Sequence, residues 1–365
     1  MPRIRVLLLF GGRSAEHDVS RVTAVSVAAA LDPARYEVIP VGITTDGQWV
    51  LAEEARALLD GARDALPASF AVEGRALVPP ADPARAELVP VEGGAPFAVD
   101  VVLPLLHGPY GEDGTVQGLL ELAGLPYVGS GVLGSAVGMD KIMMKRVLTA
   151  AGVPNARSLA HRDGHDAKAF CDEVEAAFGY PCFVKPSNMG SSVGVVKAHD
   201  RAELEAGVAT ALTYDEWILA EEMIAGREIE LAVLGDDPPA VSVPGEVVPG
   251  AEFYDYADKY EDGVAKLLVP APLSDDATAE VQALAVRAFE ACRVEAMARV
   301  DFFYDEDGRG FVCNELNTIP GFTPISMYPK LWEASGVPYR ELLDRLINLA
   351  IARHDRRVHR AGRQR

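Results

Sequence analysis

Residues 298–322 have the sequence ARVDFFYDEDGRGFVCNELNTIPGF, in which two apolar-rich runs flank the turn-forming residues DEDGRG. A tight β-hairpin needs positive φ angles at its turn, and glycine supplies them. We centre the predicted hairpin on the first glycine of the turn, which pairs Arg299 with Asn317 and Asp301 with Glu315. Side chains two residues apart on a strand share one face of the sheet, so these four groups are expected to project together.

The opposed carboxylates of Asp301 and Glu315 predict a metal site. Two carboxylates directly opposite each other, with Cβ atoms about 5 Å apart, repel and destabilise the strand pair. A divalent cation between them reverses the sign of that interaction. Together with the amide oxygen of Asn317 they form a hard-oxygen set that suits Mg²⁺ or Mn²⁺, with phosphate oxygens completing the octahedron. The alternative is a register that differs by one or two residues and leaves the acids solvated.

A second stretch, KPSNMGSSVG at residues 185–194, indicates a phosphate site. A predicted strand at 181–184 delivers Lys185, and the following Gly/Ser loop offers backbone N–H groups and the hydroxyls of Ser191 and Ser192. Close backbone approach, many donors and one positive charge suit a polyphosphate. The pattern differs from GxxxxGK[ST], because here the lysine precedes the glycines. Taken alone, such a loop is more often an ordinary connection.

Three further charged residues are candidates for nucleotide contacts. Lys141, in GMDKIMMK, begins a predicted amphipathic helix from which it could reach a phosphate. Glu221 ends the predicted strand WILAEE and Glu228 follows shortly after it. Carboxylates at such positions can accept hydrogen bonds from ribose hydroxyls or from an adenine amino group. Each of the three, taken singly, is also compatible with a solvated surface position.

The whole chain alternates helical stretches with short apolar runs, which favours an α/β protein. The run IRVLLLF at residues 4–10 predicts a buried parallel strand, and Ser20 is a plausible N-cap of the helix that follows. The stretch 51–97 is expected to be a helix plus a surface insertion. We predict four units: an N-terminal doubly wound, Rossmann-like domain at 1–125, a central unit at 126–222, a C-terminal unit at 223–352, and a basic, disordered tail at 353–365.

Composition excludes several classes of protein. A formal net charge of −20 argues against a nucleic-acid surface or an anionic-membrane binder, since either needs a basic field. No apolar run approaches transmembrane length, and the early run at 6–10 is too short for a signal peptide. The four cysteines form no CxxC pair and are predicted to be buried free thiols in a reducing compartment. We therefore expect a soluble, cytoplasmic protein.

The motifs taken together resemble the D-alanine–D-alanine ligases of the ATP-grasp superfamily. Besides the segments above, they are GGRSAEHDVS at 11–20, HGPYGEDGTVQG at 107–118, FYDYADKY at 253–260 and NELNTIPGFTPIS at 314–326. The resemblance covers residues 6–352 and implies three α/β domains with ATP between two antiparallel sheets. It also implies ATP-dependent joining of two D-alanines through a D-alanyl phosphate, releasing ADP and phosphate, for peptidoglycan precursors. Two Mg²⁺ or Mn²⁺ ions and a homodimer are further implications.

The same resemblance assigns roles to individual residues. On the nucleotide side it implies phosphate contacts by Lys141 and Lys185 with Ser192 nearby, adenine and ribose contacts by Glu221 and Glu228, and metal ligation by Asp301, Glu315 and Asn317. On the substrate side it implies that Glu16 receives the ammonium of the first D-alanine, in a region that includes His107. It further implies a clasp of Glu16, Ser191 and Tyr260, contacts to the second D-alanine's carboxylate by Lys259 and Ser326, and oxyanion donors at Arg299 and the Gly321 N–H. The segment 253–268 is aromatic and charged, which suits a mobile lid that excludes water.

Three other functions are compatible with parts of this pattern. A D-alanine–D-lactate ligase would share the fold, but ester-forming members depart from the Lys259-Tyr260 pair. Another ATP-grasp ligase, such as a carboxylase component, gives no reason for HGPYGEDG and FYDYADKY. A non-catalytic nucleotide-binding regulator would be expected to have lost a metal ligand or a phosphate lysine, and this sequence retains them all. The basic tail after residue 352 matches nothing in the family pattern.

Overall fold

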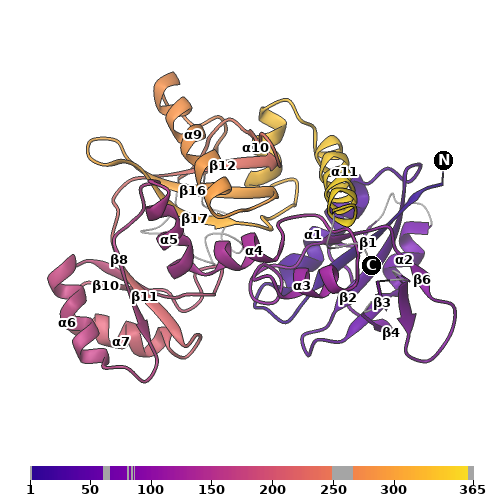
Figure 1. Cartoon of the computed structure of the whole chain (residues 1–365), viewed down its shortest axis with the longest axis horizontal. Coiled ribbons are helices and arrows are strands. Elements are labelled where there is room, and N and C mark those ends of the chain that lie inside the picture. The colour runs from indigo at the N-terminus through magenta and orange to yellow at the C-terminus, as the bar shows by residue number, and fades with distance from the viewer. Residues whose placement is uncertain are drawn as a thin grey trace.

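The computed structural model describes residues 2–60, 66–79, 82–83, 85, 87–248 and 266–360 (Figure 1). Within these ranges the strands form three sheets that follow one another along the chain, each with helices packed on it. The predicted α/β class is therefore confirmed.

The first sheet has a parallel centre. Strand β1 (Ile4–Gly11) pairs in parallel with β2 (Tyr36–Ile43) and β7 (Val101–Pro104). Residues 6–10 are all fully buried. Val6, Leu8 and Phe10 pack towards α1 (His17–Ala30), whereas Leu7 and Leu9, on the other face, pack towards α3 (Thr115–Leu122). A strand covered on both faces is apolar along its whole length. The predicted strand at residues 4–10 is confirmed.

Two expectations for this sheet are wrong. The helix begins at His17 and not at Ser20, whose hydroxyl accepts from the Gly11 N–H at 2.8 Å and donates to the Leu105 carbonyl at 2.5 Å. The stretch 51–97 is more than a helix and a surface insertion, because its strands extend the sheet in the order β6-β5-β4-β3-β2-β1-β7. Its elements are β3 (Trp49–Ala52), α2 (Glu53–Asp60), β4 (Gly74–Val78), β5 (Glu87–Pro90) and β6 (Phe97–Ala98).

The second sheet is antiparallel, in the order β10-β9-β11-β8, and has a hydrophobic core of its own. Its strands are β8 (Ser158–Arg162), β9 (Cys182–Pro186), β10 (Val196–Ala198) and β11 (Trp217–Glu222). Helices α6 (Ala167–Ala177) and α7 (Arg201–Ala211) pack on it. Asp166 and Asp200 cap their N-termini by accepting backbone N–H groups, which satisfies donors that a helix start leaves unpaired.

The third sheet runs in the order β15-β14-β12-β16-β17, with β13 beside β12. Its strands are β12 (Arg227–Gly235), β13 (Ala240–Val241), β14 (Gly245–Val248), β15 (Lys266–Leu268), β16 (Ala296–Asp305) and β17 (Gly310–Asn317). Helix α9 (Asp275–Ala291) covers it, and α4 (Val132–Met139) leads to α5 (Lys141–Ala150). The division of the chain at residues 125 and 222 stays a prediction. Helix α5 falls in the predicted central unit, yet its Met144 and Leu148 pack in the core of the third sheet.

The first and third sheets are joined by a shared core. Helices α10 (Met327–Ala334) and α11 (Tyr339–Val358) place Tyr328, Leu343 and Leu346 in the same cluster as Leu8 of β1 and Met297 of β16. Figure 1 shows α11 lying between the first sheet and the third sheet.

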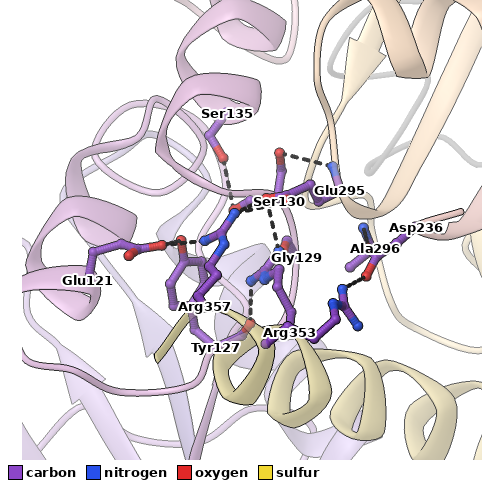
Figure 2. Close-up of polar contacts among 11 residues, drawn as sticks. Glu121, Tyr127, Gly129, Ser130, Ser135, Asp236, Glu295, Ala296, Arg353 and Arg357 are labelled. Atoms are coloured by element: carbon purple, nitrogen blue, oxygen red, sulfur yellow. Dashed lines mark hydrogen bonds and ion pairs between the residues drawn. The ribbon is translucent and has the colours of Figure 1, made fainter. Parts of the chain in front are cut away.

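The expectation of a disordered tail from residue 353 is wrong, because α11 continues to Val358. Arg353 is only 3% exposed and donates to the carbonyls of Gly129 at 2.6 Å and Tyr127 at 2.7 Å. Arg357 bridges Glu121 and Glu295, as Figure 2 shows. These arginines are ordered because fixed acceptors surround them. Residues 361–365 lie outside the described part of the chain.

The four cysteines are buried and free, as predicted. Among the described residues no helix is both long enough and apolar enough to cross a membrane.

Candidate active site

A cavity of about 430 Å³ lies between the second and third sheets, within the size range of ligand sites. Nine of the predicted site residues line it: Lys141, Lys185, Ser191, Ser192, Glu221, Glu228, Arg299, Asp301 and Glu315. The structure therefore brings together side chains from α5, the two facing sheets and the Gly/Ser loop.

The hairpin of β16 and β17 places the predicted pairs as expected. Arg299 lies opposite Asn317 and Asp301 lies opposite Glu315. The predicted centre of the turn at Gly308 is wrong, because nearer the turn Phe302 pairs with Cys313, one residue out of that register. A β-bulge at this point inserts one extra residue, Asn314, and restores the predicted pairing at the site.

Asp301 is held by its neighbours on the sheet. Arg299 donates to both of its carboxylate oxygens, at 2.8 and 2.7 Å, and the Asn317 amide donates at 2.9 Å. The Arg299 guanidinium also lies 3.0 Å from a carboxylate oxygen of Glu230. Burial acts to lower the pKa of Arg299, but Asp301 and Glu230 outweigh it and raise that pKa well above its ordinary value. Arg299 therefore stays charged.

The residues at this wall fit a divalent metal by their donor chemistry. Asp301 and Glu315 both line the cavity, with Asn317 in contact with Asp301. Nowhere in the described ranges do three or more His, Cys, Asp or Glu form a group that could hold a metal. The predicted set differs from such a group, because its third member is the amide of Asn317. Two carboxylates and one amide are the hard-oxygen combination that Mg²⁺ or Mn²⁺ takes with phosphate oxygens.

Glu221 lies between two lysines. Lys185 contacts one of its carboxylate oxygens, and the Lys145 Nζ lies 2.9 Å from the other. Burial acts to raise the pKa of Glu221, but the two lysines outweigh it and hold that pKa at about 2. Lys145 is not among the predicted site residues, although it stands one helical turn after Lys141, where side chains share a face.

Lys141 contacts the phosphate loop itself. Its Nζ donates to the Met189 carbonyl at 2.6 Å, and its backbone N–H donates to the Ser187 carbonyl at 3.0 Å. Burial lowers the pKa of Lys141, since its ammonium has lost water. These contacts tie the start of α5 to the Gly/Ser loop.

The tip of the Gly/Ser loop reaches the turn between β1 and α1. Ser191 and Ser192 have φ values of 49° and 58°, a left-handed conformation that costs non-glycine residues about 1–3 kcal/mol. In this conformation the Ser191 hydroxyl donates to the Glu16 carboxylate at 2.6 Å. Gly190 faces the same acid, because a Cβ there would lie 3.2 Å from it. The predicted contact between Glu16 and Ser191 is present.

The loop before α3 contacts the segment after β17. His107 Nδ1 lies 3.0 Å from the Ile319 carbonyl, and its Nε2 is buried with no hydrogen-bond partner. Glu112 accepts the N–H groups of Gly108 and Ile319, each at 2.9 Å. Burial, with the nearby Glu16, raises the pKa of Glu112 to about 8. Glu112 was missed, although it lies in the motif HGPYGEDG.

The remaining predicted residues divide into two groups. Gly321 and Ser326 are neighbours, since a Cβ at Gly321 would lie 3.0 Å from the Ser326 hydroxyl. Lys259 and Tyr260 lie outside the described residues, with the predicted lid from 253 to 265. The last part of that predicted lid, Lys266–Leu268, is strand β15.

Known proteins resemble this chain along almost its whole length. Profiles of the families "D-ala D-ala ligase N-terminus" and "D-ala D-ala ligase C-terminus" match residues 5–130 and 147–348. The sequence is 46% identical over 359 residues to a D-alanine–D-alanine ligase of Geobacillus thermodenitrificans, covering 96% of each chain.

Solved structures agree with that result. The D-alanine-D-alanine ligase from Coxiella burnetii matches with a TM-score of 0.83 and 35% identity, over 98% of this chain and 96% of that one. The VanG D-Ala:D-Ser ligase from Enterococcus faecalis matches with a TM-score of 0.84 and 33% identity, over 96% of this chain and 100% of that one. This chain therefore belongs to the D-alanine–D-alanine ligase family and has the ATP-grasp fold of that family.

Proposed function

We propose that this protein joins two D-alanines to D-alanyl-D-alanine at the expense of ATP, and that the dipeptide serves peptidoglycan precursor synthesis. The observation that carries the proposal is the contact between Ser191 and Glu16. It brings an acid suited to the ammonium of an amino acid against the loop suited to phosphates. A substrate carboxylate and a nucleotide γ-phosphate would then meet at one end of the cavity.

The chemistry has two steps. A carboxylate is a poor electrophile, so its oxygen first attacks the γ-phosphorus of ATP, forming an acyl phosphate as the bond to ADP breaks. The amine of the second D-alanine then attacks the acyl carbon. A C–N bond forms, the C–O bond to phosphate breaks, and the amine loses its proton.

Charge must be cancelled when a carboxylate meets a triphosphate. We assign this task to Lys141, Lys185 and Arg299, which line the same cavity. Asp301, Glu315 and Asn317 would hold two Mg²⁺ or Mn²⁺ ions, which would supply further positive charge at the phosphate oxygens. Glu221 and Glu228 are assigned to the adenine amino group and the ribose hydroxyls.

The substrate side completes the assignment. Glu16 receives the ammonium of the first D-alanine, beside His107. The oxyanion of the second step is stabilised by Arg299 and the Gly321 N–H, because donors already in place need no reorganisation. Ser326 and Lys259 are assigned to the carboxylate of the second D-alanine, and Tyr260 closes over the site with Ser191 and Glu16.

The second substrate defines the competing functions. VanG is a D-Ala:D-Ser ligase with the same fold, so the fold does not by itself select D-alanine in that position. The test supplies the purified chain with ATP, Mg²⁺ and D-alanine, alone and with equimolar D-serine or D-lactate, and separates the products. We expect D-alanyl-D-alanine to dominate in every mixture. A dominant ester or a dominant D-serine product would contradict the proposal.

The proposal includes a homodimer, taken from the family resemblance, and a cytoplasmic location, expected from the free cysteines and the short apolar runs of the sequence. Analytical ultracentrifugation of the purified chain tests the first, with a monomer at micromolar concentration as the contradicting result. Fractionation of cells that express the chain tests the second.

A further inference from the structure

Two lysine ammonium groups contact the single carboxylate of Glu221, one more than is needed to balance its charge. Lys185 contacts one carboxylate oxygen and the Lys145 Nζ lies 2.9 Å from the other. The side chains of Glu221 and Lys145 are each 5% exposed, and that of Lys185 is 14% exposed. The cluster of two ammonium groups and one carboxylate therefore carries a net positive charge in a largely buried place.

The two lysines approach Glu221 from different sides. Lys185 and Glu221 line the cavity between the second and third sheets. Lys145 borders a different hollow, formed by α5 and residues 152–158. A ligand in the cavity thus meets Lys185 directly, whereas Lys145 acts on it only through Glu221.

We propose that Lys145 is a positioning residue that stays paired with Glu221 and so allows Lys185 to transfer to the nucleotide phosphates. This inference rests on the function proposed above. If Lys185 moves to a phosphate while Lys145 remains, Glu221 keeps a charged partner and stays in place to accept a hydrogen bond from the adenine amino group. If Lys145 is absent, the same movement leaves a buried carboxylate stripped of both ammonium groups, which is costly.

The test measures KM for ATP and for D-alanine in the full chain. Lys145→Met should raise KM for ATP by about tenfold or more, the effect of losing one charge-assisted contact, with KM for D-alanine changed by less than about twofold. Lys145→Arg keeps the positive charge and should remain within about threefold of the parent. The matched control is Arg146→Met, which removes the neighbouring charge of α5, a guanidinium that contacts Met143. It should change neither KM.

A double variant separates this role from a general structural one. Glu221→Gln removes the negative charge that retains Lys185, so adding Lys145→Met to it should raise KM for ATP by less than about twofold further. If the two single effects multiply instead, Lys145 acts independently of Glu221 and the inference is wrong. If Lys145→Met does not fold, Lys145→Arg decides, since a tenfold loss of ATP affinity there also overturns the inference.

The two proposals fail in different ways. A parent protein that forms no dipeptide contradicts the proposed function. A parent that forms dipeptide, with a Lys145→Met variant whose KM for ATP is unchanged, contradicts only the role of Lys145.

Discussion

Asp301 of β16 lies directly opposite Glu315 of β17, at the wall of the cavity between the second and third sheets. Two acids in that relationship would repel each other. The Arg299 guanidinium and the Asn317 amide both contact Asp301 and offset part of that repulsion. The arrangement is one that a divalent cation would stabilise further.

The first prediction concerns this pair. Glu315→Gln should retain the fold but lose most Mg²⁺-dependent turnover, because one of the two opposed charges becomes neutral. Turnover measured against Mg²⁺ concentration checks this. Glu306→Gln is the matched control, since Glu306 is an exposed acid in the turn of the same hairpin. Near-parental activity of Glu315→Gln at millimolar Mg²⁺ would rule out the assigned ligand.

The second prediction concerns the Ser191 hydroxyl. Ser191→Ala removes its 2.6 Å hydrogen bond to Glu16, which accepts as a charged group. The expected loss is about 1.5–3 kcal/mol, or roughly 10- to 150-fold in kcat/KM for D-alanine. Ser26→Ala serves as the control, because the Ser26 hydroxyl donates to the Val22 carbonyl of its own helix α1 at an exposed position. Equal kinetics for both variants would show that the contact with Glu16 has no role.

The third prediction concerns pH and Glu112. Burial raises the pKa of Glu112 to about 8 in the folded chain, above the value of about 4.5 expected when unfolded. A raised pKa means that the fold favours the protonated form. The contribution of this group is therefore present below pH 4.5 and is lost as pH rises through 8. In the absence of metal and nucleotide, Glu112→Gln should lie close to the parent in stability near pH 4.5 and exceed it increasingly up to pH 9. Urea unfolding of both proteins at the two pH values measures their unfolding free energies. A difference between variant and parent that does not change with pH would contradict this prediction.

The fourth prediction concerns the end of α11. Arg353→Ala leaves two buried carbonyls, those of Tyr127 and Gly129, without their donor, which should cost about 2–5 kcal/mol of unfolding free energy. Arg356→Ala is the comparison, because the Arg356 ion pair with Asp236 is half exposed and such pairs contribute about 0–1 kcal/mol. Chemical denaturation of both variants gives the difference directly. Similar losses in the two would show that burial of Arg353 is unimportant.

The sequence predicted the chemistry of the site better than its geometry. The pairing of Asp301 with Glu315 is as predicted, although the strand register nearer the turn differs by one residue, because the bulge at Asn314 compensates. Such a bulge depends on how the strand bends against its neighbours. The turn residues of the hairpin carry no information about that bend. Serine is a common N-cap residue, but the Ser20 hydroxyl bonds to the backbone of Gly11 and Leu105 instead. The helix begins three residues earlier, and the sequence alone does not show these tertiary contacts.

The residues that were missed share one property. Lys145, Glu112 and Glu230 each act through a partner that is distant in sequence or on another strand. A charged residue on a helix or strand looks the same in the sequence whether it meets solvent or a buried partner. Arg353 shows the same limit, because counting arginines in the tail could not reveal the carbonyls of residues 127 and 129.

The central claim is that the carboxylate of one D-alanine is phosphorylated before the peptide bond forms. The most direct test supplies D-alanine labelled with ¹⁸O in its carboxylate, together with unlabelled ATP and Mg²⁺, and analyses the released phosphate by mass spectrometry. Because the C–O bond to phosphate breaks in the second step, each dipeptide formed should release one phosphate carrying one ¹⁸O atom from the substrate. Dipeptide formation with phosphate free of ¹⁸O would contradict the acyl phosphate mechanism.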